Sequence, residues 1–358
     1  MVSGRRRSHA GRVGCDRLSR PSSGSGTSML TVLSFDLGAD RLGDGAPVSV
    51  AADASTVYGT AASLYLVGER TATVASPRWR MPRPPGPSTT EIYQFDVADP
   101  GPPRYVAAGS VPGQLLNQYA LSEWQGHLRV ATTSGDTGGA GPDSFSTVYA
   151  LHRRGDTLQP VGRVSGLGRG ERIQSVRFLG ATAYVVTFRQ TDPLYAMDLT
   201  DPAAPRVTGE LKINGWSAYL HPVPDGRLLG VGQEADDQGR AQGFQVSLFD
   251  VHDPARPTRL ARYHVPGGSS AAEFDPHAFL YRPDTGLLAL PVDGGAVRLL
   301  RVSARQITEV GTVTHPGTGD SVVTRSLVIG ESLWTVSGAG LRATDPTTAR
   351  TLAWVPST

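Results

Sequence analysis

The chain of 358 residues carries 34 basic and 32 acidic side chains, a formal net charge of +2, and one cysteine, Cys15. The balanced charge leaves no basic face for nucleic acid, and a single cysteine excludes an internal disulfide or a cysteine-based metal cluster. With 43 glycines and 27 prolines the composition favours many turns. No apolar run approaches the roughly 20 residues that a membrane-spanning helix needs.

The start of the chain differs in composition from the rest. Residues 1–27 are mostly Arg, Ser and Gly, and their lack of apolar side chains predicts a disordered tail. Residues 28–358 form the predicted folded domain. Its first segments, 29–37 and 45–50, look like the third and fourth strands of a unit whose first half is missing. We therefore expect this chain to be an N-terminally truncated or wrongly started reading of a longer protein.

Further along, one pattern occurs three times: an apolar residue and Asp, followed three residues later by an Asp-Pro turn. The copies begin at Phe95, Met197 and Phe249, with Asp-Pro pairs at residues 99, 201 and 253. These spacings are two steps and one step of a period of about 51 residues, which is typical of solenoids and propellers. Proline presets φ and Asp accepts from turn N–H groups, so each copy predicts a hairpin.

Short β-prone runs between these turns predict six complete units of four strands each. No long run has a helical apolar period with capping residues, so helices should be nearly absent. The predicted fold is an all-β propeller of six complete four-stranded blades plus a partial N-terminal blade. Two β-sandwich domains are the alternative, which the regular period without a linker disfavours. The predicted first strands of the six blades are residues 56–59, 118–122, 174–179, 218–222, 277–281 and 322–329.

Several strings carry a resemblance to a known family, the longest being GRGERIQSVRF at residues 168–178 and AYVVTFRQTDPLY at 183–195. Over residues 28–358 the chain resembles the secreted β-propeller-domain family of bacteria and archaea, which is distantly related to WD-repeat proteins. The resemblance implies an extracellular or cell-envelope location, and it implies no reaction and no catalytic residue. Family members begin with an export signal or lipid anchor. None is visible here, so membrane attachment would require a missing N-terminal segment.

Polar residues are predicted at the mouth of a central channel, on the loops that enter the innermost strands. Most of them are acidic, and Arg172 is the only fixed positive charge that the sequence places nearby. Clustered carboxylates could hold a hard cation such as Ca²⁺, which prefers oxygen ligands. The alternative is that these side chains face water and pair with their neighbours. The candidate ligand-binding residues are Asp53, Asn117, Glu171, Arg172, Asp275, His277 and Asp320.

These patterns favour a non-catalytic binding module, because a propeller presents loops from many blades on one rigid face. Its partner would be a protein, a glycan or a small molecule. The competing hypothesis is a propeller enzyme at the channel mouth, such as a lactonase, glycosidase or quinoprotein. A glycosidase needs two facing carboxyl groups, which Glu171 with Asp275 or Asp320 could supply. Neither an H-E-x-x-H zinc motif nor a G-x-S-x-G nucleophile elbow occurs.

Overall fold

The computed structural model describes residues 12–21, 28–41, 43–71, 87–135, 141–189, 192–317 and 321–357. The chain forms two compact units. Unit 1 comprises Met1–Gly141 and Thr147–Arg163, and unit 2 comprises Pro142–Ser146 and Val164–Thr358. The prediction of one domain over residues 28–358 stays a prediction.

The regular secondary structure of the described residues is almost entirely β-strand, which confirms the predicted fold class. Within these ranges no helix is long and apolar enough to cross a membrane. The helices there are short 3₁₀ turns, namely η1 (Cys15–Arg17), η2 (Gln118–Ala120), η3 (Ala271–Glu273) and η4 (Pro276–Ala278).

Unit 1 begins with a three-stranded sheet in the order β1-β3-β2. Strands β2 (Met29–Val32) and β3 (Val48–Ala51) are antiparallel, as expected for the partial blade. Strand β1 (Leu18–Ser19) pairs in parallel with β3. These two residues lie in the segment predicted to be a disordered tail, so they form a strand in place of the expected disorder. Residues 1–11 and 22–27 of that segment lie outside the described residues.

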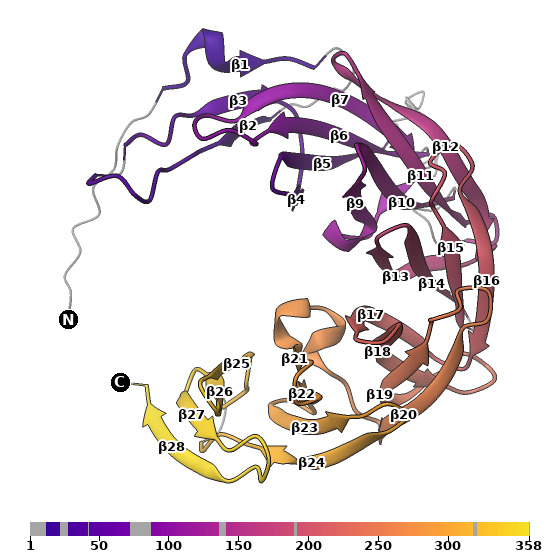
Figure 1. Ribbon diagram of the computed structural model, residues 1–358, viewed down its shortest axis with the longest axis vertical. Helices are drawn as coiled ribbons and strands as arrows, with labels where there is room; N and C mark the ends of the chain where they lie inside the picture. The colour runs from indigo at the N-terminus through magenta and orange to yellow at the C-terminus, as the bar shows by residue number, and fades with distance from the viewer. Residues whose placement is uncertain are drawn as a thin grey trace, which may run out of the picture. The chain divides into compact units, whose positions relative to one another are not determined.

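The larger sheet of unit 1 joins two four-stranded meanders (Figure 1). Their outer strands β7 (Arg104–Pro112) and β12 (Thr157–Leu167) pair in parallel, with Ala108 opposite Thr157 and Gly109 opposite Leu158. A Cβ at Gly109 would lie 2.4 Å from the Leu158 carbonyl oxygen, so this close approach requires glycine. The short strand β8 (Gln114–Leu115) also pairs with β10. The first meander is β4 (Thr56–Gly59), β5 (Ser63–Thr71), β6 (Ser88–Asp96) and β7 (Arg104–Pro112), and the second is β9 (Leu121–Trp124), β10 (His127–Ser134), β11 (Phe145–Arg154) and β12 (Thr157–Leu167).

Unit 2 contains four antiparallel sheets, each with four strands in chain order (Figure 1). Together with the two meanders of unit 1 they make the six predicted blades. The first two sheets are β13 (Arg172–Leu179), β14 (Thr182–Phe188), β15 (Asp192–Asp198), β16 (Arg206–Ile213), and β17 (Trp216–Val223), β18 (Arg227–Ala235), β19 (Ala241–Asp250), β20 (Thr258–Pro266). The last two are β21 (Leu280–Arg282), β22 (Leu287–Val292), β23 (Ala296–Val302), β24 (Ile307–Val313), and β25 (Arg325–Ile329), β26 (Ser332–Ser337), β27 (Gly340–Thr344), β28 (Thr351–Pro356).

Three predicted first strands begin later than expected. The last, predicted at 322–329, begins at Arg325 with β25, and a 3₁₀ turn precedes each of the other two. Residues 277–281 were predicted as a strand, but η4 occupies the start of this segment and β21 begins at Leu280. Residues 118–122 likewise begin with η2. The cause in these two is local capping, because the side chains of Asn117 and Asp275 accept hydrogen bonds from backbone N–H groups two residues ahead.

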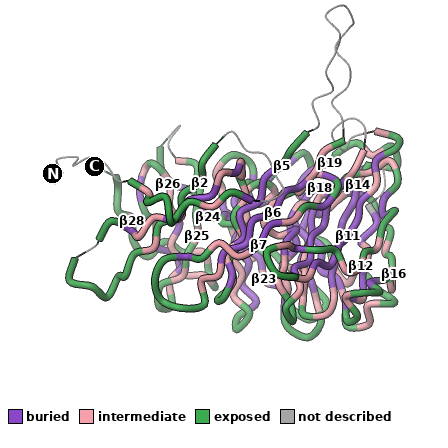
Figure 2. The backbone as a smooth tube through the Cα atoms, turned by 90° about the horizontal axis from the view of Figure 1, so that it is seen from above, coloured by how far each residue is buried: buried purple, intermediate pink, exposed green. Residues whose placement is uncertain are grey.

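The core lies between the faces of successive sheets. In unit 2, Tyr184 and Leu194 from one sheet pack with Leu220, Leu228 and Phe249 from the next. Figure 2 shows buried residues concentrated in middle strands such as β6 and β18. Both faces of these strands are covered, which explains why the second and third strands of each blade read as nearly continuous apolar runs.

The repeated Asp-Pro motif has a structural role in the loop between the third and fourth strands. Asp198 accepts from the Thr200 N–H at 2.9 Å and pairs with Arg206 at 2.6 Å. Asp201 accepts from the Ala203 N–H at 2.9 Å. The two aspartates therefore fold the loop through turns of the Asx type. Matching bonds occur between Asp96 and Ala98, Asp96 and Arg104, Asp250 and His252, and Asp253 and Ala255.

Candidate functional site

Among the residues predicted at the channel mouth, Glu171 lies just before β13 and is half-buried. The hydroxyl of Thr187 donates to its carboxylate at 2.5 Å. Burial raises the pKa of the Glu171 carboxyl, and the Thr187 hydrogen bond opposes that rise. A carboxyl group with a raised pKa is suited to proton transfer, although structural carboxyls show the same property. Arg172 begins β13 and is exposed.

Asp275 forms an ion pair, contrary to the charge distribution inferred from the sequence. Its carboxylate lies 2.8 Å from Arg325 and 3.0 Å from the Nδ1 atom of His277. Burial alone would raise the pKa of Asp275, but the hydrogen bonds from His277 and the charge of Arg325 hold it below its ordinary value. The expectation that Arg172 is the only fixed positive charge near the acidic residues is therefore wrong. The sequence pattern does not place Arg325 near Asp275, because 50 residues separate the two.

The remaining predicted residues do not all lie in the same unit. Asp53 and Asn117 belong to unit 1, where Asp53 accepts from the Ser28 N–H at 3.0 Å and Asn117 caps η2. Glu171 and Asp275 belong to unit 2, and Asp320 lies outside the described residues. Convergence of these side chains on one mouth stays a prediction.

The predicted calcium site depends on such convergence. In the described ranges, no group of three or more His, Cys, Asp or Glu residues could hold a metal ion. Asp320 is not covered by that statement, so the calcium hypothesis stays a prediction. A calcium-dependent rise in melting temperature that Glu171→Gln abolishes would establish the site.

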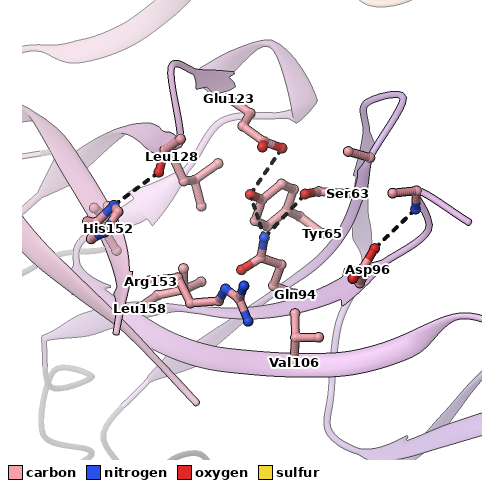
Figure 3. A pocket seen from close by; sticks show the side chains of 14 residues that line it. Ser63, Tyr65, Gln94, Asp96, Val106, Glu123, Leu128, His152, Arg153 and Leu158 are labelled. Atoms are coloured by element: carbon pink, nitrogen blue, oxygen red, sulfur yellow. Dashed lines mark hydrogen bonds between the residues drawn. The ribbon is translucent and has the colours of Figure 1, made fainter. Parts of the chain in front are cut away.

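A different site appears inside unit 1, between its two meanders (Figure 3). This pocket has a volume of about 530 Å³, within the roughly 300–1,000 Å³ of typical ligand pockets. Connections in a meander alternate between the two ends of its strands. The pocket therefore lies at the opposite strand ends from Asp53 and Asn117. Its polar lining is Ser63, Tyr65, Gln94, Asp96, Glu123, His152 and Arg153, and its apolar lining includes Val106, Leu128, Leu151 and Leu158.

A connected set of hydrogen bonds holds the polar wall in place. The Tyr65 hydroxyl donates to Glu123 Oε2 at 3.2 Å, and the Thr60 hydroxyl donates to the same oxygen at 3.1 Å. Burial raises the pKa of Tyr65, and the charge of Glu123 adds to that rise, so the phenol keeps its proton. The Gln94 amide nitrogen donates to the Tyr65 oxygen at 3.1 Å and to Ser63 Oγ at 3.2 Å.

These bonds determine which way the Gln94 amide points. Tyr65 uses its proton on Glu123, so its oxygen can only accept from Gln94, and the amide nitrogen must face it. The amide oxygen of Gln94 is then buried and accepts no hydrogen bond from the described residues. Leaving a buried acceptor unpaired costs about 1–3 kcal/mol. Such a group calls for an explanation in a native protein.

Charged side chains of both signs surround the pocket. Figure 3 shows the Arg153 guanidinium pointing into the pocket toward Gln94. Hydrogen bonds from the Ala98 N–H and from Arg104 lower the pKa of Asp96, and the charge of Arg153 contributes further. The charged lining residues are Asp96, Glu123 and Arg153, and Arg104, which lies outside the lining, neutralises Asp96 through an ion pair. The pocket therefore combines hydrogen-bonding groups with an apolar wall and has no excess of either charge.

No sequence pattern predicted this pocket, although the aligned repeats contain a signal. When the three Asp-Pro motifs are superimposed, Gln94 takes the place of Ala196 and Leu248. The last two side chains are fully buried. A polar residue at a position that is apolar in the other copies indicates a local function or a local hydrogen bond. The remaining pocket residues come from four hairpin turns and the strands beside them, so spacing alone does not bring them together.

Comparison with curated proteins finds uncharacterised archaeal relatives. A protein of Methanocaldococcus jannaschii is 38% identical over 240 residues, which is 67% of this chain and 36% of that protein. One of Archaeoglobus fulgidus is 41% identical over 182 residues, covering 51% of this chain and 27% of that protein. The chain thus spans about a third of the length of the relatives it matches.

Among solved structures, a candidate 6-phosphogluconolactonase of Bacteroides fragilis is similar with 13% identity and a TM-score of 0.45, over 74% of this chain and 78% of that one. Saccharomyces cerevisiae Sqt1 is similar with 11% identity and a TM-score of 0.39, over 75% of this chain and 81% of that one. The model of the beta propeller domain family matches residues 4–349, nearly the whole chain. Together with the six four-stranded blades, this match establishes that the chain belongs to the beta propeller domain family.

Proposed function

We propose that this protein is a non-catalytic binding module that holds a small ligand in the pocket of unit 1 and acts outside the cytoplasm. The pocket carries the proposal, because its polar wall is held in place by hydrogen bonds before any ligand arrives. Preorganised groups lose little entropy on binding, which favours affinity. The extracytoplasmic location is supported by the sequence resemblance to the secreted β-propeller-domain family.

The chemistry of the pocket supports binding in preference to catalysis. The Ser63 hydroxyl receives a hydrogen bond from the Gln94 amide, which cannot take up a proton. His152 contacts the Gly126 carbonyl oxygen through Nδ1 at 3.2 Å, and among the described residues no hydrogen bond joins its ring to Ser63. An activated serine needs a base within hydrogen-bond distance, and Ser63 has an amide there instead.

A thermal-shift screen of small molecules tests the proposal on the whole chain. A ligand that binds only the folded state raises the melting temperature with the logarithm of its concentration. We expect at least one compound to do so without being converted, and Arg153→Ala to weaken its effect. Arg153 is exposed, so this substitution should leave the fold intact. A library in which no compound raises the melting temperature contradicts the proposal. Fractionation of the native cells, with detection of the protein in each fraction, tests the extracytoplasmic location.

A hydrolase is the second candidate function, and Glu171 in unit 2 is the observation that favours it. Its half-buried carboxyl has a raised pKa, as a general acid requires. Its predicted partner Asp275 is bound to Arg325, which weakens the two-carboxylate mechanism. Assays with lactones and aryl glycosides decide between the two. If the protein converts one of these substrates and Glu171→Gln abolishes the conversion, the protein is an enzyme and the binding-module proposal fails.

A further inference from the structure

We infer that the pocket of unit 1 binds a neutral polyhydroxylated molecule, most simply a single sugar unit. The inference rests on the proposed binding function and specifies its ligand class. Its starting point is the amide oxygen of Gln94, which is buried in the pocket wall without a hydrogen-bond partner among the described residues. Because this oxygen is fully buried, a ligand hydroxyl can supply the missing donor once the Gln94 side chain turns toward the cavity.

The hydrogen-bonding groups of the pocket match alternating donors and acceptors. Gln94 and Glu123 offer carbonyl and carboxylate oxygens, while Arg153 offers guanidinium N–H groups. The Ser63 oxygen accepts from Gln94, so its own proton stays available for a ligand. A sugar hydroxyl both donates and accepts, so neighbouring hydroxyls can satisfy these groups together.

The charges argue against an ionic ligand. A phosphate or carboxylate group would need an excess of positive charge, but the pocket lining carries the carboxylates of Asp96 and Glu123 and only one guanidinium, that of Arg153. Arg104 lies outside the lining and pairs with Asp96. An ammonium group would need an excess of negative charge, and the ion pair of Asp96 with Arg104 reduces the negative charge beside the pocket. Burying an ion without a counter-charge is costly, whereas a neutral ligand avoids that cost. Leu128, Leu151 and Leu158 supply an apolar surface for the C–H face of a sugar ring.

The comparison of repeats gives an independent reason to regard Gln94 as a ligand contact. The aligned residue in the third copy of the motif is Leu248, a fully buried side chain. A leucine at position 94 would therefore suit the strand and would remove the unpaired oxygen. Gln94→Leu also removes the hydrogen bonds that Gln94 donates to Tyr65 and Ser63. The loss of these bonds and the removal of the unpaired oxygen offset each other in part, so the melting temperature should fall only slightly while sugar binding weakens clearly. A residue with a purely structural role would show the opposite pattern.

Saturation-transfer NMR and calorimetry on the full chain test the inference with glucose, galactose, mannose and N-acetylglucosamine. Glucuronate and glucosamine serve as charged comparisons. We expect at least one neutral sugar to bind more tightly than either charged compound. Gln94→Leu should weaken it by about tenfold, the effect of losing a hydrogen bond in a site built for a hydroxyl group. Arg153→Ala should weaken it as well, without affecting the fold.

Gln245 provides a matched control in unit 2. It is a buried glutamine on a third strand whose amide oxygen also has no partner among the described residues, and it does not line the pocket. Gln245→Leu should leave sugar affinity unchanged.

Preferential binding of a charged compound, or equal sugar affinity in Gln94→Leu and the parent protein, overturns the inference. If no sugar binds but another ligand does and is lost in Gln94→Leu, the sugar inference fails while the binding function stands. If no compound of any class binds, the proposed function fails too.

Discussion

Replacing His221 with phenylalanine should remove an acid-sensitive part of the protein's stability. His221 lies on β17, where its ring packs 4.6 Å from Phe279 and 5.7 Å from Tyr281. The Tyr219 hydroxyl accepts from Arg177 at 3.3 Å and lies 3.2 Å from His221 Nδ1. This chain of bonds suits a neutral imidazole whose Nδ1 accepts.

The sign and size of the effect follow from the pKa of His221. Burial lowers that pKa from 6.5 to about 4, and the charge of Arg177 adds to the effect. Between these two values the unfolded chain binds a proton at this histidine and the folded protein does not. The free energy of unfolding therefore falls as the pH is lowered from about 6.5 to about 4. A pKa difference of this size between the unfolded and folded states corresponds to roughly 3 kcal/mol of unfolding free energy. Solvent screening of the half-buried ring reduces that contribution to about 2 kcal/mol.

Urea unfolding at about pH 7 and about pH 4.5 measures this contribution. The parent protein should lose about 2 kcal/mol more than His221→Phe over this interval, because all other titrating groups are common to both proteins. Tyr219→Phe is the matched control: it removes the hydrogen bond but keeps the burial of His221, so its acid sensitivity should stay close to that of the parent. Equal losses in the parent and His221→Phe would refute the reasoning.

Three further predictions concern stability. Gly232→Ala should lower the free energy of unfolding by at least about 2 kcal/mol, because its Cβ would lie 2.0 Å from a backbone carbonyl oxygen of β17; Gly59→Ala, whose nearest neighbour would be 3.8 Å away, should have a much smaller effect in the same urea titration. Arg206→Ala should change stability by less than about 1 kcal/mol, since its pair with Asp198 is exposed to solvent. Glu171→Gln should be at least as stable as the parent at neutral pH, because burial disfavours the ionised carboxyl, and any gain should vanish as the pH falls to about 4. A loss of stability in that variant at neutral pH would contradict the assigned cause.

The repeat period and the apolar runs were sufficient to predict six four-stranded blades. These signals are local, since the middle strands carry apolar runs and three of the loops between third and fourth strands are folded by their own Asp side chains. Capping was harder to foresee. Whether Asp275 begins a strand or a 3₁₀ turn depends on one side-chain hydrogen bond to the His277 N–H, which periodicity does not reveal.

The candidate site was decided by tertiary structure. Gln94, Glu123 and Arg153 are far apart in sequence, and they meet only because two meanders pack face to face and pair through β7 and β12. Asp275 and Arg325 meet in the same way from different blades. The sequence by itself determined the repeating unit, because strand and turn preferences act over a few residues. Only packing decided which polar side chains share a pocket and which charges neutralise each other, because those interactions depend on distances between residues that the chain brings together from different blades.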